Sequence, residues 1–285
     1  MILMFGKRGQ VAQELQKFTG VLALDRTRAD LTDLSACAKA ILNYKPRAVI
    51  NAAAYTAVDM AEDEEDLANL INGEAPGAMA IVCADLNIPL VNISTDYVFD
   101  GSGEKAWDTF DLTNPQNAYG RSKLKGERAI KASGADYAIL RTSWVVSAHG
   151  NNFLKNMLRL SESQESLNVV DDQIGGPTPA QDIARACMEI VQQLINEPKK
   201  SGIYHFSGRP DVSWCQFANT IFKQADRKTF ARPILTSEYP TPALRPINSR
   251  LDCSLTESIF NITRPSWRQG LIGILRDLEI INDKT

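Results

Sequence analysis

Histidine and cysteine are scarce in this sequence, and the few that occur are scattered. His149 and His205 are the only histidines, and the five cysteines stand singly with no CxxC pair. We therefore do not expect a zinc site of the usual His/Cys kind. An odd number of dispersed cysteines is typical of reduced thiols that pack inside a cytosolic protein, which excludes a disulfide framework as the organising principle.

Long apolar runs and an excess of charge of one sign are also missing. The longest apolar stretches have the length of a strand, so no segment is expected to span a bilayer. The run Met1–Phe5 is too short for a signal-peptide core and has no basic leader. A formal net charge of -3 over 285 residues gives no reason to expect nucleic acid or a membrane surface as a partner. These features predict a cytoplasmic globular protein.

Short apolar runs alternate with longer helical patterns through the first half of the chain. Strands are predicted at residues 1–5, 21–24, 48–51, 89–94 and 137–142, and helices at about 9–18, 35–43, 75–87 and 119–133. Ser35 is the expected N-cap of the second helix. This alternation predicts parallel βαβ units, and hence an α/β fold with a Rossmann-like, doubly wound parallel sheet.

The second half of the chain is less regular. It holds predicted helices at 151–160, 181–195 and 213–224, a strand at 202–206, and expected loops at 172–179 and 231–250. We interpret the irregular part as a second, smaller α/β substrate-binding lobe. The expected NAD(P)-binding domain comprises residues 1–145 plus roughly 177–208, and the expected lobe comprises residues 146–176 and 209–285.

A phosphate-binding turn is predicted where the first strand meets the first helix, at Gly6-Lys7-Arg8-Gly9-Gln10-Val11-Ala12. Glycine lets the backbone turn tightly and approach a pyrophosphate, and a helix N-terminus presents free N–H groups to it. Because the glycines stand between a predicted strand and a predicted helix, this interpretation is favoured over a plain turn.

The residues after the second strand bear on the choice of nicotinamide cofactor. Asp25 ends that strand, where an acidic residue typically binds the adenosine ribose hydroxyls, and this favours NADH. Arg26 and Arg28 follow and could hold a 2′-phosphate, which favours NADPH. The sequence leaves the choice between NADH and NADPH open.

Tyr119 and Lys123 are the residues on which the predicted chemistry depends. Their spacing of four places them on one face of a helix. An ammonium and an oxidised nicotinamide favour the tyrosinate and lower the tyrosine pKa from about 10, which makes the hydroxyl a workable proton donor and acceptor. Thr95 directly follows the predicted strand 89–94, at the edge where open parallel sheets bind ligands, and its hydroxyl could hydrogen-bond a carbonyl oxygen.

The motifs run almost from end to end of the chain. They resemble those of the extended short-chain dehydrogenase/reductases and, more narrowly, those of the dTDP-4-dehydrorhamnose reductase family. The middle and last segments are the most specific of the set, since the glycine turn is shared with many dehydrogenases. The matching segments are 5–11, 50–59, 94–101, 117–124, 141–144, 172–178 and 239–251.

This resemblance implies an NAD(P)H-dependent reduction of the C4 keto group of dTDP-4-dehydro-L-rhamnose to dTDP-L-rhamnose, in dTDP-rhamnose biosynthesis. It implies three catalytic residues, Thr95, Tyr119 and Lys123. The residues implied to contact the dTDP-sugar are Thr95, Asp96, Tyr119, Trp144 and Arg245. The residues implied to line the cofactor are Gly6, Gly9, Gln10, Val11, Asp25, Asp30, Leu31, Ala53, Ala54, Tyr55, Tyr119 and Lys123.

Several alternatives stay open at this point. Arg245 and Arg250 could hold a diphosphate or be salt-bridged loop residues. Some relatives bind Mg²⁺ at a subunit contact through glutamates, and Glu14 is the candidate ligand here, so Mg²⁺ binding and a homodimer are both undecided. Two other functions fit the fold, namely a nucleotide-sugar epimerase or dehydratase and a non-catalytic regulatory subunit such as that of methionine adenosyltransferase. The intact Thr95, Tyr119 and Lys123 argue against the regulatory subunit.

Overall fold

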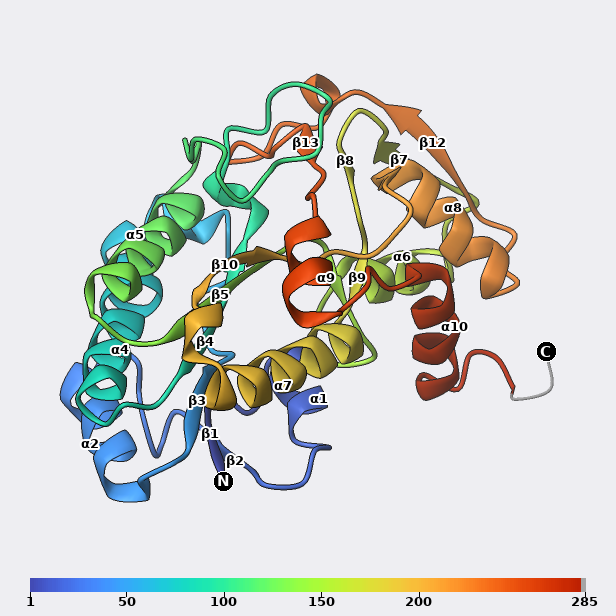
Figure 1. Cartoon of the computed structure of the whole chain (residues 1–285). Helices are drawn as coiled ribbons and strands as arrows, with labels where there is room; N and C mark the ends of the chain where they lie inside the picture. The colour runs from blue at the N-terminus through green and yellow to red at the C-terminus, as the bar shows by residue number, and fades with distance from the viewer. Residues whose placement is uncertain (283–285) are drawn as a thin grey trace.

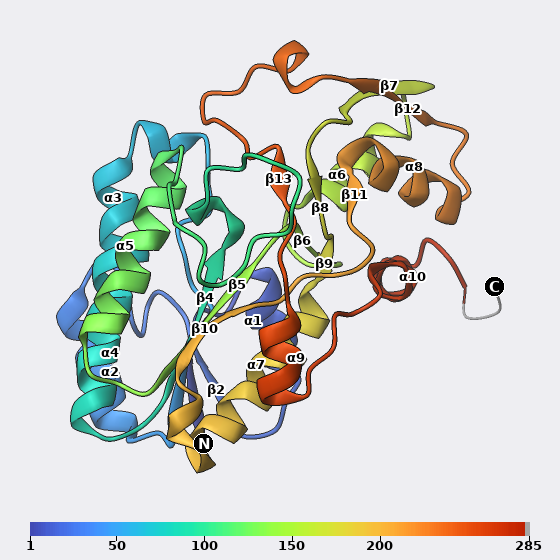
Figure 2. The same cartoon turned by 45° about the horizontal axis from the view of Figure 1, so that its top comes forward.

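The computed structural model describes residues 1–282 and has a parallel six-stranded sheet at its centre (Figures 1 and 2). This confirms the predicted doubly wound α/β fold. Phe5 pairs with Leu24 on one side and with Asn51 on the other, so three strands end level with one another. In order across the sheet the strands are β2 Val21–Leu24, β1 Ile2–Phe5, β3 Ala48–Asn51, β4 Leu90–Thr95, β5 Tyr137–Thr142 and β10 Gly202–His205.

The sheet is covered on both faces because its strands are apolar on both faces, as is typical of interior parallel strands. In β1, Leu3 and Phe5 pack with the helices of one face, and Ile2 and Met4 pack with those of the other. One layer consists of α2 Leu34–Tyr44, α4 Ala75–Asp85 and α5 Ala118–Ala132. The opposite layer consists of α1 Gln10–Leu15 and α7 Ala180–Asn196.

A second core lies beyond the sheet, on the side where α8 and α10 are drawn in Figure 1. Its elements are α6 Phe153–Leu160, β7 Ser166–Val170, α8 Trp214–Gln224, β12 Phe230–Ile234 and α10 Trp267–Asp277. Strands β7 and β12 pair in parallel under α8. Phe217 and Trp267 are fully buried there and meet edge to face.

Short elements connect the two cores. Strands β8 Ile174–Gly175, β11 Val212–Ser213 and β13 Asn248–Ser249 form a small sheet, and β6 Val145–Val146 pairs with β9 Thr178–Pro179. Helix α9 Ser254–Phe260 returns to the main sheet, where Phe260 packs with residues of α7 and β10. The division into a cofactor domain and a lobe stays a prediction, and part of the 209–285 segment touches the core of the sheet.

Some local predictions are wrong for identifiable reasons. Asp33, not Ser35, caps α2, since the Asp33 carboxylate accepts from the Ala36 N–H at 2.9 Å. The expected loops at 172–179 and 231–250 contain β8, β9, β12 and β13, because partners distant in sequence pair with these short segments. The structure also contains α3 Glu65–Asn69 and short turns at η1 Met60–Glu62, η2 Leu70–Glu74 (a π turn), η3 Asp96–Val98, η4 Pro198–Lys200 and η5 Thr236–Glu238.

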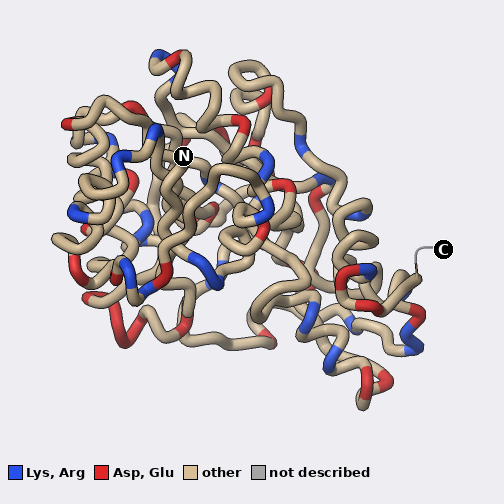
Figure 3. The backbone as a smooth tube through the Cα atoms, turned by 90° about the horizontal axis from the view of Figure 1, so that it is seen from below, with Lys and Arg blue, Asp and Glu red and all other residues tan. Residues whose placement is uncertain are grey.

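Charge is mixed over the molecule. Figure 3 shows basic and acidic positions interspersed along the backbone, in keeping with the small net charge. Among residues 1–282, no helix is both long and apolar enough to cross a membrane.

Candidate active site

The glycine turn lies at the carboxyl end of β1, where the chain connections diverge to opposite sides of the sheet. Gly6 has a φ of +103°, and a Cβ there would lie 3.1 Å from the backbone of Ala52 and Ala53. Only glycine fits both the conformation and the space. Gly9 precedes α1 and is exposed. A switch point of this kind is where open α/β sheets bind dinucleotides.

Gln10, the first residue of α1, holds the segment 147–152, which leads into the second core. The Gln10 carbonyl Oε1 accepts from Ser147 Oγ at 2.8 Å and from Asn152 Nδ2 at 2.9 Å. Val11, another predicted cofactor residue, is buried in the sheet core. Both side chains therefore have partners within the protein, while Gln10 stays partly exposed at the start of α1.

Glu14, the candidate magnesium ligand, has other partners. One carboxylate oxygen lies 2.9 Å from His149 Nε2, and the other lies 2.8 Å from Lys17 Nζ. Within residues 1–282, no group of three histidine, cysteine, aspartate or glutamate side chains is arranged to hold a metal ion. The structure thus gives no support to a magnesium site at Glu14.

Asp25 lies beside the glycine turn, as expected of a ribose-binding carboxylate. Its Oδ1 accepts from Thr27 Oγ1 at 2.6 Å, and this hydrogen bond is the main reason that the pKa of Asp25 is lowered. Lys7 Nζ lies 3.7 Å from the other carboxylate oxygen. Lys7, Arg8 and Asp25 line a small pocket with Gln13 and Gln16. Both a carboxylate and two cations therefore face the position expected for the adenosine ribose.

The arginines after β2 do not enter this pocket. Arg26 Nε donates to Asp30 Oδ2 at 2.8 Å, and Arg26 is highly exposed. Asp30 also accepts from the Thr32 N–H, and Leu31 is buried in the core beside α2. Neither Arg26 nor Arg28 lines the pocket, and the 2′-phosphate role that the sequence suggested for them stays a prediction.

A buried asparagine that sequence reasoning missed fixes the chain after β3. Asn72, in the π turn η2, accepts from the Tyr55 N–H at 2.8 Å and donates to the Tyr55 carbonyl at 2.9 Å. Its Nδ2 also donates to Ser122 Oγ, which in turn donates to the Tyr119 carbonyl. Asn72 therefore joins the Ala53-Ala54-Tyr55 segment to α5. A polar residue within an apolar helical pattern was the only sequence signal for it.

Thr95, Tyr119 and Lys123 meet at the carboxyl end of β4. Asn117 caps α5 by accepting from the Gly120 N–H at 2.7 Å, which starts the helix one residue before Tyr119. Thr95, the last residue of β4, donates from Oγ1 to Asp96 Oδ1 at 3.2 Å, and its side chain lies close enough to Tyr119 to act on the pKa of that tyrosine. Lys123 is buried, and its Nζ donates to the Ile93 carbonyl at 2.6 Å. The structure thus brings the three expected catalytic residues together.

The electrostatics of this cluster differ from the sequence expectation. Burial raises the pKa of Tyr119 to about 12. The Thr95 side chain acts in the opposite sense, and Asp96 adds to the rise. Burial lowers the pKa of Lys123 to about 8, against the attraction of Glu127. Without the cofactor the pKa of Tyr119 is therefore raised, because the side chain is removed from water. The expected lowering, which includes the charge of an oxidised nicotinamide, stays a prediction.

Asp96 and Trp144, both expected to contact the substrate, follow the neighbouring strands β4 and β5. Asp96 is 3% exposed and burial raises its pKa to about 6. Among the described residues nothing hydrogen-bonds its Oδ2. Trp144 follows β5 with a φ of +48° and stacks on Trp214 at 3.5 Å between ring centroids. A bulky residue in this conformation is uncommon and typical of functional sites.

Arg245 comes from the loop before β13 and is ion-paired. Its Nη2 lies 2.7 Å from Asp59 Oδ2, and its charge acts on the pKa of Tyr97. The Tyr97 ring meets Tyr119 edge to face at 5.6 Å. Arg245 thus lies close to the catalytic cluster. Arg250, the other candidate, donates to Asn248 Oδ1.

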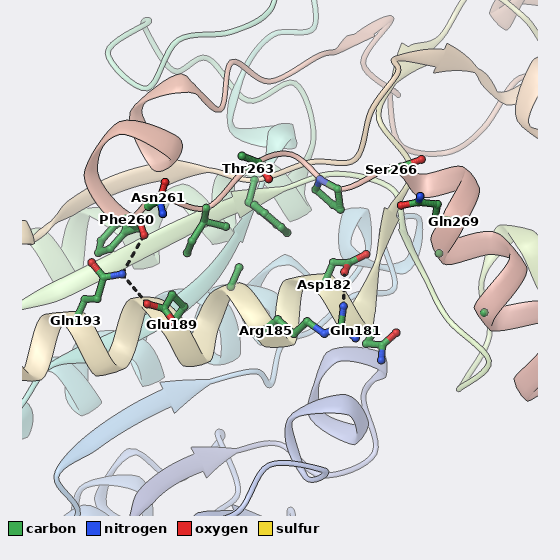
Figure 4. Close-up of a pocket in the computed structure, with 16 residues that line it drawn as sticks. Gln181, Asp182, Arg185, Glu189, Gln193, Phe260, Asn261, Thr263, Ser266 and Gln269 are labelled. Atoms are coloured by element: carbon green, nitrogen blue, oxygen red, sulfur yellow. Dashed lines mark hydrogen bonds and ion pairs between the residues drawn. The ribbon is translucent and has the colours of Figure 1, made fainter.

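A larger cavity of about 730 Å³ lies elsewhere, between α7 and residues 260–273 (Figure 4). Phe260 forms part of its wall, with polar groups such as Asp182 and Gln193 at the side of α7. None of the expected site residues lines it.

A dinucleotide turn after β1 and a Thr/Tyr/Lys cluster at β4, two strands further across the sheet, define an NAD(P)-dependent oxidoreductase of the extended short-chain dehydrogenase/reductase class. The model of the family described as "RmlD substrate binding domain" matches residues 1–280. The chain belongs to this family, that of the dTDP-4-dehydrorhamnose reductases.

The chain matches individual relatives over nearly their whole length. The chain is 42% identical over 275 residues to a dTDP-4-dehydrorhamnose reductase of Sinorhizobium fredii, covering 93% of both chains. It resembles the crystal structure of such a reductase from Clostridium acetobutylicum with a TM-score of 0.91 and 37% identity, covering 98% of this chain and 99% of the other. The Bacillus anthracis reductase, whose structure was solved in complex with NADP, matches with a TM-score of 0.90 and 34% identity, covering 97% of this chain and 98% of the other.

Proposed function

We propose that this chain reduces the C4 keto group of dTDP-4-dehydro-L-rhamnose with NAD(P)H and forms dTDP-L-rhamnose, in dTDP-rhamnose biosynthesis. The observation that carries the proposal is the contact between Thr95 and Tyr119 with Lys123 behind them, at the end of β4. The match to dTDP-4-dehydrorhamnose reductases over nearly the whole chain supports the choice of substrate.

The cofactor fits the carboxyl ends of β1, β2 and β3. Gly6 leaves a space against Ala52 and Ala53 that any side chain would fill, and Gly9 is exposed at the start of α1. We assign the pyrophosphate to this turn and the adenosine ribose to Asp25. The nicotinamide and its ribose are assigned to Lys123 and to the segment Ala53–Tyr55. When bound, the reduced nicotinamide supplies the hydride for C4.

The residues of the cluster handle the charge that develops on the carbonyl oxygen. A tyrosine whose pKa is about 12 is fully protonated at neutral pH, so Tyr119 has a proton to donate to that oxygen. Thr95 hydrogen-bonds the same oxygen and stabilises its charge. Lys123, as an ammonium, holds the nicotinamide ribose hydroxyls and favours the tyrosinate left after proton donation.

The sugar nucleotide is assigned to the residues around this cluster. The free Asp96 Oδ2 is an acceptor for a sugar hydroxyl. Trp144 is partly exposed and has one face stacked on Trp214, and we assign the rest of its ring to the sugar. Arg245 would exchange Asp59 for the diphosphate, which a guanidinium binds through two parallel hydrogen bonds.

Both reduced cofactors suit the adenosine pocket. Asp25 can accept from the ribose hydroxyls of NADH, while Lys7 and Arg8 can neutralise the 2′-phosphate of NADPH. We propose that NADPH and NADH are both used, with Lys7 as the main contact of the 2′-phosphate. A cytoplasmic location and a homodimer stay predictions.

The test is a parallel assay with dTDP-4-dehydro-L-rhamnose and either NADH or NADPH, followed by the absorbance of the reduced nicotinamide. The proposal expects one cofactor oxidised for each sugar converted. Conversion of a sugar nucleotide without net oxidation would identify an epimerase or dehydratase. No turnover together with a tight protein partner would identify a regulatory subunit.

A further inference from the structure

Three side chains of α5 hold three consecutive residues of β4. Tyr119 contacts Thr95, Lys123 donates to the Ile93 carbonyl, and the carboxylate of Glu127 accepts from Ser94 Oγ at 2.6 Å. Positions 119, 123 and 127 lie one above the other on a helix. The first two carry the proposed chemistry, and the third has no part in it so far.

Glu127 is fixed from its other side by a buried arginine of β5. Arg141 donates from Nε and Nη2 to the two carboxylate oxygens, at 2.9 and 2.7 Å. The side chain of Glu127 is 1% exposed and that of Arg141 is 2% exposed. Arg141 also lies over the Phe99 ring, with Nη1 3.4 Å from His205 Nε2. Apolar pairs of similar volume often replace buried ion pairs without loss of stability, so stability alone does not account for this one.

We propose that Glu127 is a positioning residue of the reduction, which locks α5 in register against β4 so that Tyr119 and Lys123 face Thr95. Glu127 does not touch the reacting atoms. It works through Ser94, which lies between the two residues of β4 that Lys123 and Tyr119 contact. This inference rests on the proposed function.

The charge of Glu127 has a second effect on the same cluster. Glu127 raises the pKa of Lys123 against the burial that lowers it to about 8. Other charged groups near α5 are engaged elsewhere. On its exposed side, Glu65 of α3 pairs with Arg121 and Glu74 of η2 pairs with Lys125.

The remaining charges act on other groups of the cluster. Glu62 of η1 accepts from the Ala118 N–H, and Asp96 of η3 raises the pKa of Tyr119. On β10, burial lowers the pKa of His205 to about 3, so this histidine is neutral beside Arg141. Glu127 is thus the carboxylate that acts on Lys123 among the described residues.

The experiment compares Glu127→Gln, Glu127→Asp and the control Glu65→Gln, which removes an exposed ion pair of the same helix. We measure kcat, KM for the keto sugar, and the affinity for NADPH as a function of pH by nucleotide fluorescence without the sugar. E127Q is expected to lower kcat about tenfold with little change in KM, as misplacement of a proton donor predicts. The pH at which NADPH affinity falls is expected to drop by about one unit, because Lys123 loses its carboxylate.

The other variants separate positioning from folding. E127D keeps the charge and is expected to restore the pH dependence, and E65Q should behave as the parent. A folded E127Q with the kcat and pH dependence of the parent would overturn the proposal.

If E127Q does not fold, Ser94→Ala replaces it, since Ser94→Ala removes the contact between Glu127 and β4 and leaves the ion pair with Arg141 intact. S94A should lower kcat with unchanged NADPH affinity, and an unchanged kcat would overturn the inference.

A failure of the proposed function can be told apart from a failure of the proposed role of Glu127. If the parent enzyme turns over no keto sugar, the proposed function fails. The NADPH titrations of E127Q and E127D still decide whether Glu127 acts on Lys123, because they need no sugar.

Discussion

Gly120 lies directly against the carbonyl oxygen of Tyr97, with no room for a methyl group between them. This contact brings the first turn of α5 close to η3 and sets the distance between Tyr119 and Thr95. Gly120→Ala is therefore expected to push the helix away from β4. We predict a loss of about 1–3 kcal/mol in the free energy of unfolding, typical of overpacking, and a larger relative loss of kcat. Denaturant unfolding and initial rates check this, with Gly273→Ala in α10, where an added Cβ meets nothing within 4 Å, as the steric control.

The pH dependence should follow Lys123. Its pKa of about 8 lies below that of an ordinary lysine, so the ammonium is present below about pH 8 and is lost as the pH rises through that value. Because the ammonium holds the ribose, we predict that kcat/KM for NADPH is constant at neutral pH and falls above about pH 8. A rate that stays level up to pH 10 would show that the charge of Lys123 is not needed.

Lys7 should decide how well the enzyme uses NADPH. Lys7→Met removes a cation from the pocket that it shares with Asp25. We predict that affinity for NADPH falls about tenfold, the effect of one charge-assisted hydrogen bond, while affinity for NADH changes little. Calorimetric titration of both cofactors measures the ratio. The matched control Lys17→Met removes a cation that pairs with Glu14 outside the pocket. Equal losses for the two cofactors would mean that Lys7 does not contact the 2′-phosphate.

Arg245 should act on the sugar nucleotide alone. Arg245→Met is predicted to raise KM for the dTDP-sugar at least about tenfold, as loss of a bidentate contact to a diphosphate implies, and to leave NADPH affinity unchanged. Arg232→Met, on the exposed strand β12, is the control. A KM within twofold of the parent would assign Arg245 to the ion pair with Asp59 and to nothing more.

The nucleotide-binding half of the fold was predictable because each of its strands is a compact apolar run between helical patterns. Strands β2, β3 and β5 begin and end at the predicted residues. Strands β7 and β12 were missed, since Pro233 argues against a strand and the pairing depends on a partner far along the chain. Local pattern carries no information about such pairings.

The catalytic cluster was predictable for a similar reason. Helical spacing places Lys123 beside Tyr119, and the rule that ligands bind at the carboxyl ends of strands adds Thr95. The direction of the Tyr119 pKa could not be predicted, because it depends on burial that only the packed structure reveals. Asn72 and Glu127 were missed for the same cause, since their partners lie on other elements.

The most direct test of the account compares the parent enzyme with Tyr119→Phe. Oxidation of NADPH by dTDP-4-dehydro-L-rhamnose and the binding of NADPH are both measured. We predict stoichiometric oxidation by the parent, a loss of about 10²–10⁴-fold in kcat for Y119F, as removal of a proton donor implies, and nearly unchanged NADPH binding. Turnover by Y119F at the rate of the parent would contradict the assignment of Tyr119 as the proton donor.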